Sequence, residues 1–381
     1  DAAIANRLAL DAVERGAEAI LFTVENRFDL ETVFKNFPFS TSGLYIDWKF
    51  LDEAFISDTI SYLKEKNATV YHLIDVLGNL ASSGNWFHNS AKDHTLLETL
   101  IKKFPVEHLI SVSTSVYQNA GANMVQQLAY GLAHANEYLN HFDPSKQNAS
   151  PPITFTVAVG SNYFFEIAKI RALRMLFASL ASAYNTPTTC HIIALPSRRN
   201  KTLYDYNVNM LRTTTECMAA TLGGANSVCN LPYDALYHKS NEFGERIARN
   251  QLLILKNESY FDAVSNPADG SYYIETLTHQ LAEKALELFK SIEKGGGLLS
   301  QLKEGTLQKK IKESAQKEQD WFDEGKIVLL GTNKYPNKAD QMKHDLELFP
   351  FVKTNKRKTE IAPIIAKRLS ENVEQERLSH E

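Results

Sequence analysis

The sequence contains little cysteine and no long apolar run, and each absence excludes a class of protein. Its three cysteines, Cys190, Cys217 and Cys229, form no C-x-x-C pair. An odd and sparse count does not build a disulfide framework and is typical of reduced thiols, so it predicts a cytoplasmic protein. The apolar runs, such as residues 192–195, are far too short to span a bilayer, and we expect no membrane segment.

Neither sign of charge is in clear excess. The 381 residues include 41 lysines and arginines against 45 aspartates and glutamates, a net charge of −4. This balance gives no electrostatic reason to expect nucleic acid or an anionic membrane as a partner. No signal peptide is visible. Asp1 is not a natural first residue, so we expect the true N-terminus to lie before it.

Several common catalytic motifs are also missing. No G-x-G-x-x-G follows the first predicted strand, and neither G-x-S-x-G nor a phosphate-binding P-loop occurs. No cysteine has the basic neighbours that would activate a thiolate. The usual signatures of dinucleotide binding and of nucleophilic catalysis are therefore absent.

Short apolar runs alternate with helical segments along the chain. The strand-like runs are residues 19–24, 43–46, 70–74, 109–112, 153–159, 188–194 and 226–229. Between them lie stripes of 3.6-residue spacing, the clearest within residues 164–176. Such alternation predicts parallel β/α units, which form either a TIM (β/α)8 barrel or an open doubly wound sheet. Because residues 1–16 read as a helix, a barrel requires one more strand before Asp1.

The character of the chain changes near its end. Residues 1–335 carry the β/α pattern, and we assign them to the barrel. Residues 307–325 read as a charged helix and 326–330 as a short β-like piece. Residues 336–381 are lysine-rich and weakly periodic. We predict that they form an extended linker or wrapping arm towards a further C-terminal domain.

Each candidate site also has a structural interpretation. His88, Asp93 and His94 have no usual metal-ligand spacing, so we assign no metal. The hydroxyl-rich strand end Ser111, Ser113, Thr114 and Ser115 lines a pocket or, as we favour, caps the next helix.

The remaining candidates are basic and aromatic. Arg198 and Arg199 have the geometry for phosphate but lack a glycine-rich loop, which favours an exposed loop. His191, inside a strand, is interpreted as a core histidine. Four tyrosines could rim a pocket or fill a core: Tyr204, Tyr206, Tyr233 and Tyr237.

Several motifs together resemble the methylmalonyl-CoA mutase family. They are residues 119–122 (NAGA), 163–172 (YFFEIAKIRA), 221–227 (TLGGANS), 266–285 (NPADGSYYIETLTHQLAEKA) and 331–335 (GTNKY, similar to a post-barrel strand). The order of the motifs agrees with that family across nearly the whole chain. The resemblance implies a substrate barrel and, in the holoenzyme, the interconversion of methylmalonyl-CoA and succinyl-CoA with adenosylcobalamin supplying the radical.

Members of this family are often heterodimers of a catalytic large chain and a related small chain. Residues 208–212 (VNMLR) resemble the corresponding sequence of the small chain. Three departures from the catalytic pattern agree with this: residues 194–197 (ALPS) replace a histidine-containing T-H-x-Q-T-S-G run, residues 114–116 (TSV) replace Gly-Tyr-His, and Pro152 replaces an arginine. The cobalt-ligating D-x-H-x-x-G motif is absent from the sequence.

The resemblance therefore implies a small, non-catalytic subunit that stabilises a large mutase subunit. We expect no catalytic, cofactor-binding or metal residue in this chain, with adenosylcobalamin bound through the large subunit. Alone, the chain is expected to self-associate or to be unstable. The alternative is a catalytic acyl-CoA mutase chain that lacks both of its ends. A filled barrel interior would favour the subunit, and an open channel lined by polar groups would favour the catalytic chain.

Overall fold

The computed structural model describes residues 1–142, 151–353 and 356–381. Seven parallel strands form one sheet in strict sequence order, β1-β2-β3-β4-β5-β6-β7. The strands are β1 (Ala19–Val24), β2 (Gly43–Trp48), β3 (Val70–Ile74), β4 (His108–Ser113), β5 (Ile153–Val159), β6 (His191–Pro196) and β7 (Ser227–Val228). All seven predicted strands are therefore present. The sequence also predicts a polar, proline-bounded loop around residues 143–152, most of which lies outside the described residues.

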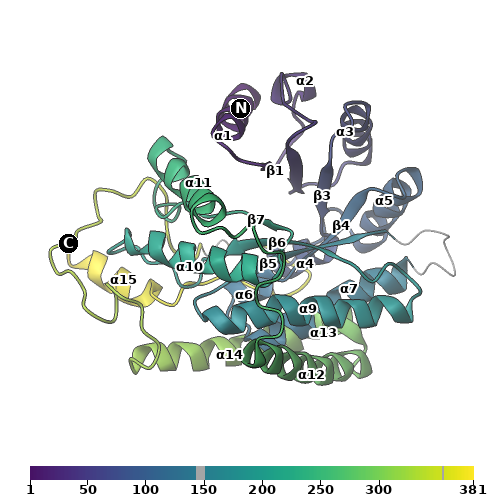
Figure 1. The fold of residues 1–381 in the computed structure, drawn as a ribbon. Coiled ribbons are helices and arrows are strands. Elements are labelled where there is room, and N and C mark those ends of the chain that lie inside the picture. Colours follow the sequence, from purple (N-terminus) through teal and green to yellow (C-terminus); the bar gives the residue numbers. More distant parts are fainter. Residues whose placement is uncertain (143–150, 354–355) are drawn as a thin grey trace.

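The strand order decides between the two predicted architectures. A doubly wound sheet reverses its order at a switch point, whereas a barrel adds each strand beside the one before it. Here every strand pairs with its sequence neighbour, and the sheet curls (Figure 1). Within the described residues β1 pairs only with β2, and β7 only with β6. The fold is thus a curled α/β half-barrel compatible with a TIM-like fold.

Helices cover the outer face of this curled sheet, apart from the last one, which lies to the side of it (Figure 1). Those of the N-terminal half are α1 (Ala2–Glu14), α2 (Leu30–Val33), α3 (Glu53–Glu65), α4 (Val76–Ser83), α5 (Ser90–Lys103), α6 (Ser115–Asn119) and α7 (Met124–His141). The others are α9 (Tyr163–Ala183), α10 (Val208–Leu222), α11 (Glu242–Asn257), α12 (Tyr272–Lys294), α13 (Gly297–Glu304), α14 (Thr306–Asp323) and α15 (Glu371–Ser379). Side-chain caps determine where several of these helices begin. Asp52 caps α3, and Asn123 with Gln126 forms a capping box on α7.

The sheet has two different faces. On β2, Leu44, Ile46 and Trp48 are buried and belong to the main core between the sheet and its helices. Tyr45 lies between them in sequence and belongs to a separate cluster with Leu73 and Ile193. Because successive strand residues point to opposite faces, this second cluster lies on the inner, concave face of the sheet.

Two local predictions are wrong. Residues 326–330 and the motif at 331–335 form no strand; within the described part of the chain they contain only an isolated bridge between Leu330 and Lys334. The reason is Asn333, whose side chain binds Leu329 N and the carbonyl of Ile327 and so closes a compact turn. In addition, the sequence alone predicts a long helix that starts at Thr276 or Thr278, whereas α12 starts at Tyr272, with Ser271 as N-cap.

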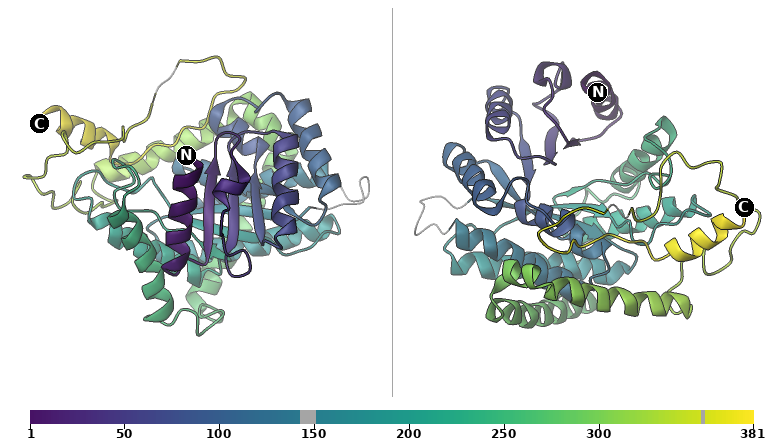
Figure 2. Two further views of the ribbon diagram at one scale, coloured as in Figure 1. Left: turned by 90° about the horizontal axis from the view of Figure 1, so that it is seen from above. Right: turned by 180° about the vertical axis from the view of Figure 1, so that it is seen from behind.

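The last segment of the chain lies against the body of the protein rather than apart from it (Figure 2). Ile364 N donates to Ala81 O at 2.7 Å, and Leu369 N donates to Arg199 O at 3.0 Å. These contacts place it across the segments that follow β3 and β6. Of the helices in the described ranges, none combines the length and apolar content needed to cross a membrane.

Candidate functional site

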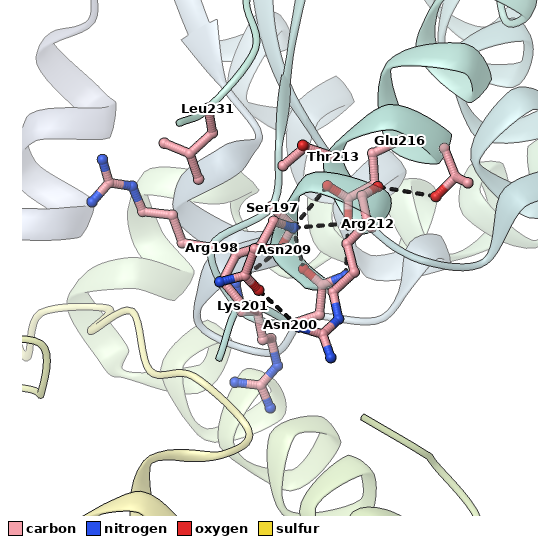
Figure 3. Close-up of polar contacts among 12 residues, drawn as sticks. Ser197, Arg198, Asn200, Lys201, Asn209, Arg212, Thr213, Glu216 and Leu231 are labelled. Carbon is pink, nitrogen blue, oxygen red and sulfur yellow. Dashed lines mark hydrogen bonds and ion pairs between the residues drawn. The ribbon is translucent and has the colours of Figure 1, made fainter. Parts of the chain in front are cut away.

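The densest buried polar network follows β6, at the carboxyl end of the sheet (Figure 3). Lys201 is 1 % exposed, and its Nζ donates to Glu216 Oε1 at 2.8 Å and Oε2 at 2.7 Å. Lys201 Nζ also donates to Asn200 Oδ1 at 2.7 Å, while Asn200 Nδ2 donates to Glu216 Oε1 at 2.7 Å. The ion pair thus joins the loop after β6 to α10, which carries Glu216.

Burial acts on both charges of this pair. It raises the pKa of the Glu216 carboxyl and lowers the pKa of the Lys201 ammonium, and in each case the partner's charge opposes the shift. Because the ammonium contacts both carboxylate oxygens, each ion compensates the other inside the protein. A general acid or base needs a free proton site facing a substrate, and this pair presents none.

A second layer of hydrogen bonds holds the same loop. Asn209 Nδ2 donates to the carbonyls of Thr202 and Tyr233, at 2.9 and 3.0 Å. Arg212 donates to Asn209 Oδ1 at 2.7 Å, Thr202 Oγ1 at 2.8 Å and Leu330 O at 2.8 Å. Each polar group is therefore occupied by another part of the protein. The arrangement fixes a loop and leaves no group directed at a ligand.

The two neighbouring arginines behave differently. Arg198 is more exposed than Arg199, in agreement with the prediction, but the groups around its guanidinium desolvate it enough to lower its pKa. It makes no ion pair with any residue that the structure describes. Arg199 contradicts the exposed-loop interpretation because it is only 6 % exposed. Its Nε lies 2.6 Å from Glu318 Oε2, and it donates to Lys367 O at 2.7 Å. Arg199 was misjudged because its partners come from distant parts of the chain.

The concave face of the sheet is occupied by aromatic rings. Tyr45, on β2, is 4 % exposed, and its hydroxyl lies 2.7 Å from His191 Nε2 on β6. The same hydroxyl hydrogen bonds to Ser227 on β7. The rings of Tyr71 and His191 stack with centroids 3.8 Å apart, and Tyr45 stacks on Tyr71 at 4.9 Å. Side chains of β2, β3, β6 and β7 therefore meet inside the half-barrel and fill this part of its interior.

His191 is a satisfied interior histidine, in agreement with its predicted role. Burial lowers its pKa to about 4, so the imidazole is neutral at physiological pH. Burial also raises the pKa of Tyr45 to about 12. The pair is thus an uncharged hydrogen bond between neighbouring rings.

The segment that ends β4 does not cap the following helix through its side chains. Thr114 Oγ1 donates to Thr156 O at 3.1 Å, and Ser115 Oγ donates to the same carbonyl at 3.4 Å. No side chain caps α6. Instead, Ser113 N donates to Asp75 Oδ2 at 2.8 Å. The capping interpretation is therefore wrong, because the hydroxyls of Thr114 and Ser115 bind the neighbouring strand β5.

Asp75 is the centre of a further buried network that the sequence did not indicate. It caps α4 through Gly78 N at 2.7 Å and contacts His134 Nε2 at 2.9 Å. The Tyr138 hydroxyl also donates to it, at 3.0 Å. Burial alone would raise the pKa of Asp75. The charge and hydrogen bond of His134, with the backbone donors, outweigh burial and lower it.

Two other candidate clusters have structural roles within the described residues. Asp93 accepts from the backbone N–H of Phe87 and His88, while His94 Nδ1 contacts Ser90 O, so the cluster organises a loop. No group of metal-ligating side chains occurs within the described ranges. Tyr204 and Tyr237 join a small core with Met342 and Phe351 of the C-terminal segment.

The positions where the resemblance expects substrate-binding groups carry other side chains. Ala194 is fully buried, Leu195 lies on the concave face, and Ser197 Oγ donates to Gln118 Oε1 at 2.9 Å. Pro152 directly precedes β5. None of these places a cationic donor or an imidazole inside the half-barrel.

Comparison with known proteins agrees with the sequence motifs. The family model described as "Methylmalonyl-CoA mutase" matches residues 29–379. A protein named methylmalonyl-CoA mutase small subunit, from Porphyromonas gingivalis, is 39% identical over 244 residues, which cover 62% of this chain and 40% of that protein.

Two proteins of Streptomyces virginiae are also similar. The one named methylmalonyl-CoA mutase small subunit is 32% identical over 69% of this chain and 43% of its own length. The one named large subunit is 32% identical over 63% of this chain and 34% of its own length. The chain thus matches less than half the length of these relatives.

Proposed function

Because this chain belongs to the methylmalonyl-CoA mutase family, we propose that it is the barrel portion of a small, non-catalytic subunit. Its role is to pack against a large mutase subunit and stabilise it, while the large subunit binds adenosylcobalamin and isomerises the acyl-CoA. The names of the P. gingivalis and S. virginiae relatives support a small-subunit assignment and a large-subunit partner.

The observation that carries the proposal is the filled interior. A barrel that admits an acyl thioester needs open space along its axis. In this chain the ring of Tyr45 reaches from β2 to His191 and Ser227 on β6 and β7. Ring stacking with Tyr71 fixes this arrangement. These rings occupy the half-barrel near the amino ends of its strands, and because packed side chains leave few voids, they would have to repack before a ligand could pass there.

The residues do not fit the cofactor either. His191 is stacked on Tyr71, and its Nε2 is hydrogen bonded to Tyr45, so it does not offer a free nitrogen to a metal. His134 is fully buried between Asp75 and Tyr117. We therefore derive no reaction step in this chain and assign the cobalamin chemistry to the partner.

The same proposal includes a closed barrel and a C-terminal arm. An eighth strand between β1 and β7, preceding α1, would close the sheet into a (β/α)8 barrel, in which each strand lies beside its sequence neighbour. Residues 1–335 form this barrel unit. Residues 336–381 form a wrapping arm, supported by the contacts of Ile364 and Leu369 with the barrel loops.

A catalytic chain that lacks its ends is the second candidate. Its support is that the large and small subunits of S. virginiae are equally similar to this chain, at 32% identity. Identity therefore does not separate the two roles. The barrel interior distinguishes the catalytic from the supporting role, since catalysis needs an open channel with groups that hold the thioester and carboxylate of the substrate.

The proposal is tested by co-expression with a homologous large mutase subunit. We expect the tagged chain to retain the large subunit at equimolar ratio, and the large subunit to be more resistant to thermal inactivation when paired. Calorimetric titration of the chain alone with methylmalonyl-CoA should show no binding. Micromolar binding by the chain alone, or failure to retain the large subunit, would contradict the proposal.

A further inference from the structure

A cavity of about 280 Å³ lies where three separate segments meet. They are the loop after β6 at Tyr204, the turn that begins at Gly331, and helix α15 near the C-terminus. Its walls are mainly apolar and include Tyr204, Pro336 and Val373. The volume is slightly below the range of pockets that hold drug-sized ligands, so it suits a smaller molecule.

Most of the polar side chains around this cavity can donate a hydrogen bond. Thr332 is 9 % exposed, and its hydroxyl has no hydrogen-bond partner among the described residues. A buried hydroxyl without a partner is unfavourable, and an acceptor would remove that cost. Lys338 is exposed at the rim and forms no ion pair with any described residue. Arg377 lies over the Tyr204 ring, 3.9 Å from its centroid.

The nearby acceptor is already occupied. Glu374 lines the cavity, but its Oε1 accepts from Leu203 N at 2.7 Å. Its Oε2 lies 2.6 Å from Arg368 Nη1 in an ion pair, without a hydrogen bond of normal geometry. The lining therefore has an excess of donors and of positive charge. A complementary ligand carries an anionic acceptor at one end and an apolar body at the other.

The turn at residues 331–335 explains how this geometry arises. Gly331 has φ +79°, and a Cβ there would lie 2.4 Å from Asp205 Oδ2, so only glycine allows so close an approach to the loop after β6. This approach places Thr332 beside Tyr204. Asn333 then fixes the turn through Leu329 N at 2.8 Å. The motif is thus required for the shape of the cavity.

We propose that this cavity binds a small organic carboxylate. The Thr332 hydroxyl and the Lys338 ammonium contact the carboxylate, and Tyr204 and Val373 surround the apolar body. Because the cavity is bounded by both a barrel loop and α15, an occupant ties the C-terminal segment to the barrel. Binding then reduces the motion of α15.

The test is calorimetric titration of the intact chain with hexanoate, together with hexan-1-ol and inorganic phosphate. Hexanol has the apolar body without the charge, and phosphate has charge without an apolar body. We expect hexanoate to bind at least about tenfold more tightly than either, since a hydrogen bond to a charged group contributes about that much. Hydrogen exchange should slow in α15 when hexanoate is present.

Two variants locate the binding site. Lys338→Ala and Thr332→Val should each weaken hexanoate binding by about tenfold. Thr332→Val nearly keeps the side-chain shape, so the fold is retained. Lys290→Ala, which removes an exposed lysine of α12, is the control and should leave binding unchanged. The inference is wrong if hexanoate fails to bind at millimolar concentration, or if both pocket variants bind it as well as the parent.

Discussion

The buried ion pair between Lys201 and Glu216 makes a quantitative prediction about stability. The two side chains are 2 % and 0 % exposed. Replacing Lys201 by methionine keeps most of the side-chain volume but removes the charge that compensates Glu216. Asn200 then remains as a donor to the carboxylate, and it is neutral.

The magnitude follows from leaving a charge buried without its partner. We expect Lys201→Met to lower the free energy of unfolding by about 3–5 kcal/mol at pH 7. The double variant Lys201→Met with Glu216→Leu removes both charges. It should recover most of that loss, since an apolar pair of similar volume often replaces a buried ion pair at little cost.

The pH dependence provides a second check. In Lys201→Met the pKa of Glu216 rises further, above its value in the unfolded chain. A carboxyl with a raised folded-state pKa stabilises the protein at low pH and loses that contribution as the pH rises through the folded-state pKa. The Lys201→Met variant should therefore be less impaired near pH 5 than near pH 8.

Urea denaturation of the parent and of each variant measures these effects. Lys310→Met is the control, because Lys310 forms an exposed pair with Glu313 and its loss should have no measurable effect. The reasoning would be refuted if Lys201→Met cost less than about 1 kcal/mol. It would also be refuted if the double variant were no more stable than the single one.

Three further predictions concern the other networks. Asp75→Asn should reduce the loss of unfolding free energy at acid pH. A carboxyl whose pKa is lowered in the folded protein gives stability that is present above pH ~4 and lost as the pH falls below it. Urea midpoints between pH 3 and 7 measure this. In the parent, stability should fall as the pH drops from about 6.5, where the unfolded imidazole of His191 titrates, to about 4, its folded-state pKa. His191→Phe should remove this fall. An unchanged slope of the unfolding free energy against pH would contradict a buried neutral histidine. Tyr45→Phe should cost about 1–2 kcal/mol, since it removes the hydroxyl that joins β2 to β6 and β7; Phe39→Leu, on another surface of the fold, serves as an unrelated aromatic comparison.

The strands were predictable because each is a short, mainly apolar run, which is a local feature of the sequence. Continuous apolar runs such as Ile153–Val159 are buried on both faces, and the run read from the sequence agrees with the observed strand. The predicted sixth strand began at residue 188, before the observed start at His191, because β-branched residues also favour extended loops. Apolar pattern alone does not reveal where pairing with a neighbour begins.

The buried polar networks were not predictable from local pattern. Lysine and glutamate are rarely buried, so residues 197–201 read as an exposed loop. Lys201 is buried because α10 presents Glu216 to it, fifteen positions later in the chain. Likewise, Tyr45 and His191 are 146 positions apart and meet only when the sheet curls. Contacts of this kind depend on the closure of the fold.

The two faces of the same strand are under different physical constraints. Replacing an outward residue such as Leu44 or Ile46 by alanine leaves a cavity in the main core and lowers the free energy of unfolding by about 2–5 kcal/mol. An inward residue such as Tyr45 instead decides whether the interior is open to a ligand. The relatives named small and large subunit in S. virginiae are each 32% identical to this chain. Under the proposed function, a few inward side chains such as Tyr45, rather than overall identity, would distinguish a supporting barrel from a catalytic one.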